Sequence, residues 1–200
     1  MLTDAAVDFI VIDATNAFTY SEPAKKLIGV WYEYLLQGFD VPQIAYYTNS
    51  YSADTINRIY DEIYNQIKND DDTLILDGKP LIIGNENDGE IKPEAKEYFR
   101  IKQSQWPNAD KVDDGFPWME FDRSLTYKSV FKKDGVKIMN VSVAQHSDTC
   151  AFSKTAWYGA NDRTRSWHNG KNDSSENAML YGYNFAEQWE WALKQDPEII

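Results

Sequence analysis

Apolar runs and amphipathic runs alternate along most of the 200-residue chain. Unbroken apolar runs predict strands covered on both faces, and apolar positions three and four apart predict helices with one buried face. The predicted strands are 7–13, 41–49, 79–85, 115–121 and 135–147, and the predicted helices are 21–39, 52–70, 92–106 and 177 to about 194. Strands and helices that alternate in this way indicate right-handed parallel βαβ units.

Local signals at helix ends support this assignment. Ser21 is the expected N-cap of the first helix, Pro23 fits its first turn, and Gly38 is expected to end it. The second helix carries an apolar face of four isoleucines at helical spacing: Ile56, Ile59, Ile63 and Ile67. The stretch between the last two strands predicts only a weak helix, at about 125–131.

The fold class predicted is α/β, and two features favour a (β/α)8 barrel of the TIM type over an open doubly wound sheet. Every predicted strand ends in a polar cluster, and the pattern begins and stops part-way through a repeat. We therefore expect one barrel domain over residues 1–200 that is a fragment of a longer chain. No glycine-rich phosphate loop follows a strand, which argues against a dinucleotide-binding fold.

Charge and composition narrow the class of partner. With 20 basic and 32 acidic residues, the net charge of −12 disfavours nucleic acids and anionic membrane surfaces. No apolar run approaches the roughly 20 residues of a membrane span. The chain has 7 Trp and 13 Tyr, and aromatic faces are typical of sugar-binding clefts, although a large aromatic core is the alternative.

Polar and aromatic side chains gather at the carboxyl end of each predicted strand, where parallel barrels carry their active sites. The candidates are Asp13, Asn16, Tyr47, Asn49, Asn85, Trp118, Glu120, Gln145 and His146. Carboxyls, amides and aromatic rings are the groups that glycoside hydrolysis requires. With two histidines in the chain and no metal-ligand spacing, neither a metal nor a cofactor is expected.

Glu120 is the leading acid/base candidate, because the neighbouring indole of Trp118 would raise the pKa of its carboxyl group. The alternative is a surface glutamate. Asp13 is the second catalytic candidate or a ligand for sugar hydroxyls, and its alternative is a carboxylate that braces its own turn. The other candidates are expected to bind substrate; for His146 the alternative is a polar residue at a strand end.

Several segments resemble (β/α)8 proteins related to glycoside hydrolase families 71 and 99, which are large bacterial proteins described as glycosidases. The most specific are "DFIVIDATN" and "YGYNFAEQWEWALKQDPE", and "WMEF" resembles the segment that carries a strand-end glutamate in that family. The resemblance implies that the strands are the second to sixth of a barrel and that the seventh begins at the end of the chain. It also implies that a further catalytic glutamate, in an "NEW"-type segment, lies beyond Ile200.

The leading hypothesis is a carbohydrate-active glycoside hydrolase that degrades a poly- or oligosaccharide, with a periplasmic or secreted location implied by the resemblance alone. Two alternatives stay open: a non-catalytic sugar-binding barrel, and a barrel fragment without activity. An aldolase or isomerase on the same fold would need a strand-end lysine for Schiff-base chemistry, and the predicted strand ends supply none. The sugar, its linkage and the oligomeric state are not specified by the sequence.

Overall fold

The computed structural model describes residues 2–68, 78–106, 112, 115–118, 131–133, 136–141, 166–168, 171–173 and 178–200. They belong to two compact units, Met1–Ser104 and Gln105–Ile200. The expectation of a single domain over residues 1–200 stays a prediction.

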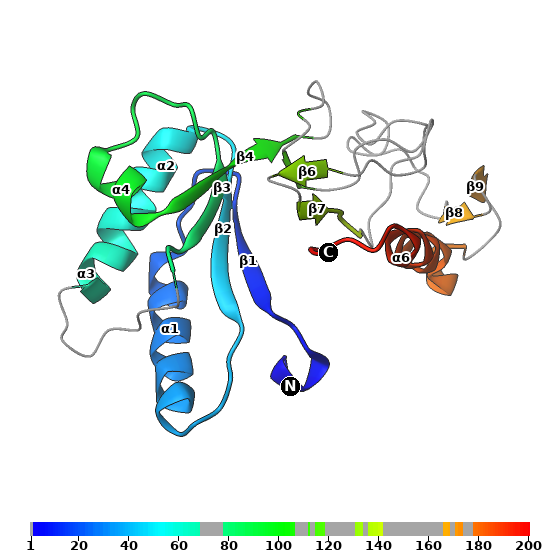
Figure 1. The fold of residues 1–200 in the computed structure, drawn as a ribbon, viewed down its shortest axis with the longest axis horizontal. Helices are drawn as coiled ribbons and strands as arrows, with labels where there is room; N and C mark the ends of the chain where they lie inside the picture. The colour runs from blue at the N-terminus through cyan, green and yellow to red at the C-terminus, as the bar shows by residue number, and fades with distance from the viewer. Residues whose placement is uncertain are drawn as a thin grey trace. The chain divides into compact units, whose positions relative to one another are not determined.

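Five parallel strands form one sheet in the order β1-β2-β3-β4-β5 and curl through 216° into a half-barrel, with helices between them (Figure 1). The strands are β1 (Phe9–Ala14), β2 (Gln43–Thr48), β3 (Leu81–Gly84), β4 (Arg100–Gln105) and β5 (Phe116–Pro117). This is an incomplete β/α barrel, as the alternation in the sequence predicts.

Register fixes which side chains share a face of the sheet. Asp13 of β1 pairs with Tyr47 of β2, and Tyr47 pairs with Ile83 of β3. Ile83 in turn pairs with Lys102 of β4. Because side chains alternate between faces along a strand, these four residues lie on one face and their neighbours Ile12, Tyr46, Ile82 and Ile101 lie on the other.

The helices of unit 1 are packed on this second face of the sheet (Figure 1). They are α1 (Ser21–Leu36), α2 (Ser52–Ile59) with its continuation through a π-helical segment (Tyr60–Tyr64) into α3 (Asn65–Lys68), and α4 (Pro93–Tyr98). A short 3-10 helix (Thr3–Ala5) precedes β1. The isoleucine face predicted for the second helix is confirmed, since Ile56, Ile59 and Ile63 are fully buried and Ile67 packs against the same core.

Aromatic residues supply much of the core of unit 1. Tyr60 and Tyr64 of the π-helical segment make edge-to-face or tilted contacts with Tyr98 and Phe99 at the end of α4. Burial raises the pKa of the Tyr46 and Tyr64 hydroxyls above their ordinary value. Part of the aromatic content of the chain is therefore structural, which was one of the two interpretations of the composition.

The predicted helix over 92–106 is wrong in its second half. The helix ends at Tyr98, Phe99 is extended, and the next six residues form β4, paired with β3 from Leu81↔Arg100 to Gly84↔Gln103. Ser21 is also not the N-cap of α1: it is the first helical residue, and Tyr20 takes the cap position without a side-chain hydrogen bond. The expected stop at Gly38 is confirmed by its φ of 85° just beyond the helix.

Besides β5, the described residues of unit 2 form two short hairpins and one long helix. They are β6 (Phe131–Lys133) with β7 (Val136–Ile138), β8 (Ser166–His168) with β9 (Lys171–Asp173), and α6 (Tyr183–Gln195) after a 3-10 turn (Ala178–Tyr181). The helix to about 194 is confirmed. The long strand over 135–147 is not: β7 spans three residues and is antiparallel to β6, residues 139–141 are outside any strand, and 142–147 lie outside the described residues.

Candidate functional site at the strand ends

The first strand end is held in a tight turn. The Oδ1 atom of Asp13 accepts a hydrogen bond of 2.9 Å from the Thr15 backbone N–H, and Asn16 Oδ1 accepts one of 3.2 Å from the Phe18 N–H. Both side chains are exposed. One carboxylate oxygen of Asp13 therefore braces its own turn, which is the alternative role raised by the sequence, and the other lies at the surface.

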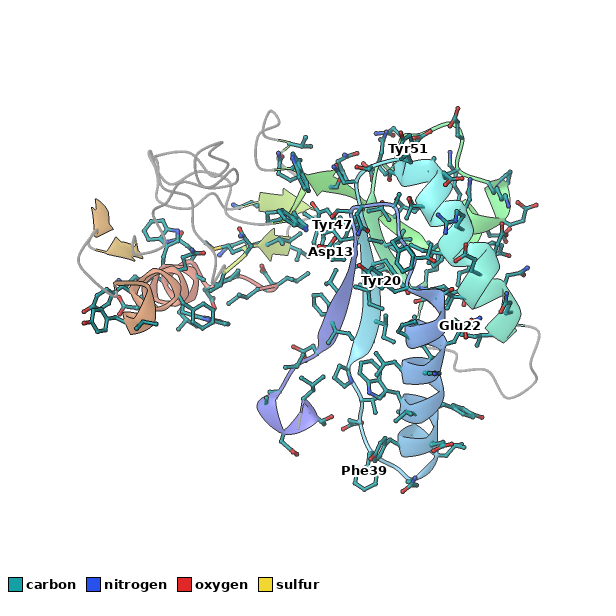
Figure 2. The ribbon with its side chains drawn as sticks, turned by 180° about the vertical axis from the view of Figure 1, so that it is seen from behind. Asp13, Tyr20, Glu22, Phe39, Tyr47 and Tyr51 are labelled. Atoms are coloured by element: carbon teal, nitrogen blue, oxygen red, sulfur yellow. The ribbon has the colours of Figure 1, made fainter. Side chains whose placement is uncertain are left out.

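The other predicted residues of unit 1 have different environments. Tyr47 is buried on β2 as the register neighbour of Asp13, and the two lie side by side in Figure 2. Asn49 is half-buried just after β2, whereas Asn85 is exposed after β3 and its backbone N–H donates to Ser52 Oγ at 2.9 Å. The structure thus brings Asp13 and Tyr47 together and leaves the two asparagines on separate loops.

A network centred on Glu62 of the π-helical segment holds the loop after β1, residues 15–20, which we call the β1 loop. The Thr19 hydroxyl donates to Glu62 Oε2, and Arg58 Nε donates to Glu62 Oε1 at 3.0 Å. Burial raises the pKa of Glu62, but its hydrogen bonds from Thr19 and Arg58, with the positive charge of Arg58, outweigh this and hold the pKa below its ordinary value.

Backbone contacts complete the attachment of the β1 loop. Arg58 Nη1 donates to the Ala17 carbonyl at 3.1 Å, and the Tyr46 hydroxyl donates to the Thr19 carbonyl at 3.1 Å. The Ser50 N–H, in the loop after β2, donates to the Thr15 carbonyl at 3.1 Å. The β1 loop is therefore fixed both to the helix layer and to the next strand-end loop.

In unit 2, the indoles of Trp106 and Trp118 stack with their ring centroids 4.7 Å apart and an interplanar angle of 25°. Trp106 follows β4 and Trp118 follows β5, so both stand at carboxyl ends of strands. Both side chains are half-buried. Trp118 was a predicted site residue, whereas Trp106 was missed because it fell at the end of the wrongly extended helix.

The side chain of Gln105 connects the backbone around these two rings. Its Oε1 accepts a hydrogen bond of 2.6 Å from the Val112 N–H, and its Nε2 donates to the Trp106 carbonyl at 3.0 Å. The Gln105 carbonyl accepts one of 3.2 Å from the Trp118 N–H. Gln105 is almost completely buried, so it acts as a polar brace beneath the tryptophan pair.

An apolar pocket lies elsewhere in unit 1, at the amino end of β2. Its walls include Trp31 of α1, Val41 and Pro42 before β2, and Tyr64 and Ile67 from the second helical segment. None of the predicted site residues lines this pocket. In β/α barrels, residues at the amino ends of the strands stabilise the fold, whereas active sites lie at the carboxyl ends. We do not assign the candidate site to this pocket.

Three predicted residues, Glu120, Gln145 and His146, lie outside the described residues. Within the part of the chain that is described, no group of three or more histidine, cysteine or acidic side chains is arranged to hold a metal ion. No helix among the described residues is long and apolar enough to cross a membrane. No protein-family model, curated protein or solved structure matches this chain.

Proposed function

We propose that this chain is part of a carbohydrate-active glycoside hydrolase that acts on a neutral poly- or oligosaccharide. The observation that carries the proposal is the stacked pair of Trp106 and Trp118 at the carboxyl ends of β4 and β5. Half-buried indoles present flat apolar surface of the kind that packs against the apolar face of a pyranose. The net charge of −12 favours a neutral rather than an anionic ligand.

The proposed chemistry assigns proton transfer to carboxyl groups at the strand ends. Glu120, two residues after Trp118, is the proposed acid/base, and the exposed oxygen of Asp13 is the proposed second carboxylate or a ligand for sugar hydroxyls. Asn16, Asn49 and Asn85 supply amides for sugar hydroxyls. The resemblance to glycoside hydrolase families 71 and 99 supports this assignment through the segments quoted above.

A non-catalytic sugar-binding barrel is the second candidate function. It is favoured by one observation, the hydrogen bond from the Thr15 N–H to Asp13 Oδ1. A carboxylate that braces a turn has less freedom to act as nucleophile or base, so a barrel of this kind would bind sugar without cleaving it.

The test is a screen of the full chain against mannan, xylan and laminarin that measures binding and release of reducing ends together. We expect Glu120→Gln to abolish release and keep binding, and Trp118→Ala to weaken binding by about tenfold. Trp189→Ala, which removes an exposed indole from α6, is the matched control and should change neither. Binding without release by the unaltered chain would favour the sugar-binding barrel, and the absence of both would contradict the proposal.

A further inference from the structure

Two aromatic rings stand exposed in the β1 loop, at the carboxyl end of the first strand. Phe18 and Tyr20 are 57% and 37% exposed, and their rings meet edge to face with centroids 4.7 Å apart and an interplanar angle of 78°. Phenylalanine ranks among the residue types most often fully buried in proteins. Packing within the chain therefore does not explain why this pair is held at the surface.

The backbone that carries the two rings is firmly attached. The carbonyl oxygens of Ala17 and Thr19, the residues that precede Phe18 and Tyr20, accept hydrogen bonds from Arg58 and Tyr46. The Phe18 N–H donates to Asn16, and the Tyr20 carbonyl accepts from the first turn of α1. The loop is thus ordered by polar contacts while its largest apolar side chains point outward.

The same loop has a strained backbone. Ala17 and Tyr20 have φ of 63° and 51°, in the left-handed region that is unfavourable for residues with a Cβ. Such conformations persist where the surroundings over-determine them, and they cluster at ligand-binding sites. The hydrogen bonds from Arg58 and Tyr46 hold the β1 loop in this conformation, with the rings of Phe18 and Tyr20 exposed.

Hydrogen-bonding groups lie at the end of β1 and in the β1 loop that follows it. The second carboxylate oxygen of Asp13, the amide nitrogen of Asn16 and the hydroxyl of Tyr20 make no hydrogen bond within the part of the chain that is described. Apolar ring surface beside donors and acceptors matches a pyranose, which has an apolar face and a rim of hydroxyl groups. A charged ligand is disfavoured, because the chain is strongly acidic and Asp13 lies at this turn.

We propose that Phe18 and Tyr20 form a subsite on which a neutral sugar ring stacks, with Asp13 and Asn16 binding its hydroxyls. This inference rests on the proposed carbohydrate function and adds a binding position to it. Because the loop is already ordered, little conformational entropy is lost when a ligand binds to the two rings. The contacts of Phe18 and Tyr20 with the sugar therefore add to the affinity. The subsite belongs to unit 1 and does not involve the tryptophan pair.

The test is calorimetric titration of the full chain with mannohexaose, xylohexaose and laminarihexaose. The variant Phe18→Ala with Tyr20→Ala should raise the Kd of the bound oligosaccharide by at least about tenfold. The matched control removes a second edge-to-face pair, Tyr34 and Phe39, with centroids 5.8 Å apart and exposures of 48% and 57%. Phe39 lies at the opposite end of α1 from Tyr20 (Figure 2), and this control should change the Kd by less than about twofold.

A second variant guards against loss of folding. Phe18→Tyr with Tyr20→Phe keeps both rings and should keep the Kd within about threefold, and circular dichroism checks the fold of every variant. An unchanged Kd in the double alanine variant, an equal loss in the control pair, or no binding of any hexaose would overturn the subsite. Binding and release that depend on Trp118 and Glu120 but not on Phe18 or Tyr20 would overturn the subsite alone and leave the proposed function intact.

Discussion

The hydroxyl of Thr19 donates a hydrogen bond of 2.5 Å to Glu62, a residue 43 positions further along the chain. It joins the loop after the first strand to the π-helical segment behind the sheet. Arg58 donates to the same carboxylate and also to the Ala17 carbonyl. Glu62 therefore binds the loop directly through Thr19 and indirectly through Arg58. The stability of the β1 loop should therefore depend on the charge of Glu62.

Glu62→Gln tests that dependence. We expect the free energy of unfolding at pH 7 to fall by about 1–2 kcal/mol, because the amide of glutamine is uncharged and offers one acceptor oxygen where the carboxylate offers two. The folded pKa of Glu62 lies below its ordinary value of 4.5, so its contribution is complete above that value and is lost as the pH falls through the folded pKa. The difference between the two proteins should shrink between pH 6 and pH 3 in urea titrations.

Glu22→Gln is the matched control for this experiment. Glu22 forms a surface ion pair with Lys25 at 2.6 Å and its side chain is 75% exposed, so solvent screens its charge. Its substitution should change stability at pH 7 much less than Glu62→Gln does, because solvent screens a surface ion pair. A Glu62→Gln effect that is no larger than the control, or that does not vary with pH, would show that the carboxylate does not hold the loop.

Gly84, at the end of β3, is predicted to tolerate no side chain. A Cβ at this position would lie 2.4 Å from Thr48 Oγ1 and 2.6 Å from Ser52 Oγ, two hydroxyls that hydrogen-bond each other at 2.8 Å. Gly84→Ala should lower the free energy of unfolding by about 2–3 kcal/mol through overpacking. Gly29, inside α1, has open space around it, and Gly29→Ala should raise stability by up to about 1 kcal/mol.

The two glycine variants add the same methyl group and are compared by urea denaturation. Opposite signs are expected because one position is crowded by α2 and the other gains helix propensity. Destabilisation of similar size at both positions would contradict the close approach of α2 to β3.

Gln105→Glu tests the polar brace beneath the tryptophan pair. A protonated glutamic acid can accept from the Val112 N–H and donate to the Trp106 carbonyl as Gln105 does, but a carboxylate cannot donate to that carbonyl. Burial should raise the folded pKa of the new carboxyl group above its unfolded value, so stability is retained at low pH and lost as the pH rises through the folded pKa. We expect a deficit of about 2 kcal/mol at pH 8 that narrows at pH 5.

The control for this substitution lies on the same strand. Gln103 is half-buried, and within the described part of the chain its Nε2 donates to the neighbouring Ser104 carbonyl. Gln103→Glu should show a smaller deficit and a weaker dependence on pH. Equal pH profiles for the two variants would contradict the role assigned to Gln105.

The alternation of apolar runs and helical faces was sufficient to predict the half-barrel, because each βαβ unit is a local pattern. It failed at β4, where "RIKQSQ" consists mostly of good helix formers and directly follows a true helix. The available signal was the two-residue period of Phe99, Ile101, Gln103 and Gln105. Residues 100–105 form a strand because they pair with β3. Propensity scales consider each residue alone and do not include the neighbouring strand.

The candidate site was predictable only in part. Asp13, Asn16 and Trp118 could be proposed from the sequence because they lie at or just after the ends of strands, but the roles proposed for Trp106, Phe18 and Tyr20 depend on which ring each one meets in space. Glu62 falls inside the helix predicted over 52–70, and nothing in that pattern indicates its contact with Thr19, which it makes from the π-helical segment. Contacts between residues about 40 positions apart leave no trace in the local pattern.

The π-helical segment also limits which insertions and deletions this chain can accept. A π turn holds one residue more than an α turn, so Tyr60–Tyr64 contains the equivalent of a single inserted residue within an otherwise regular helix. Deletion of one residue there would restore a regular helix but would rotate the following positions by about 100°. Relatives in which the same helix holds this loop should therefore keep the extra residue. In relatives that lack it, the loop after the first strand should be held by other contacts.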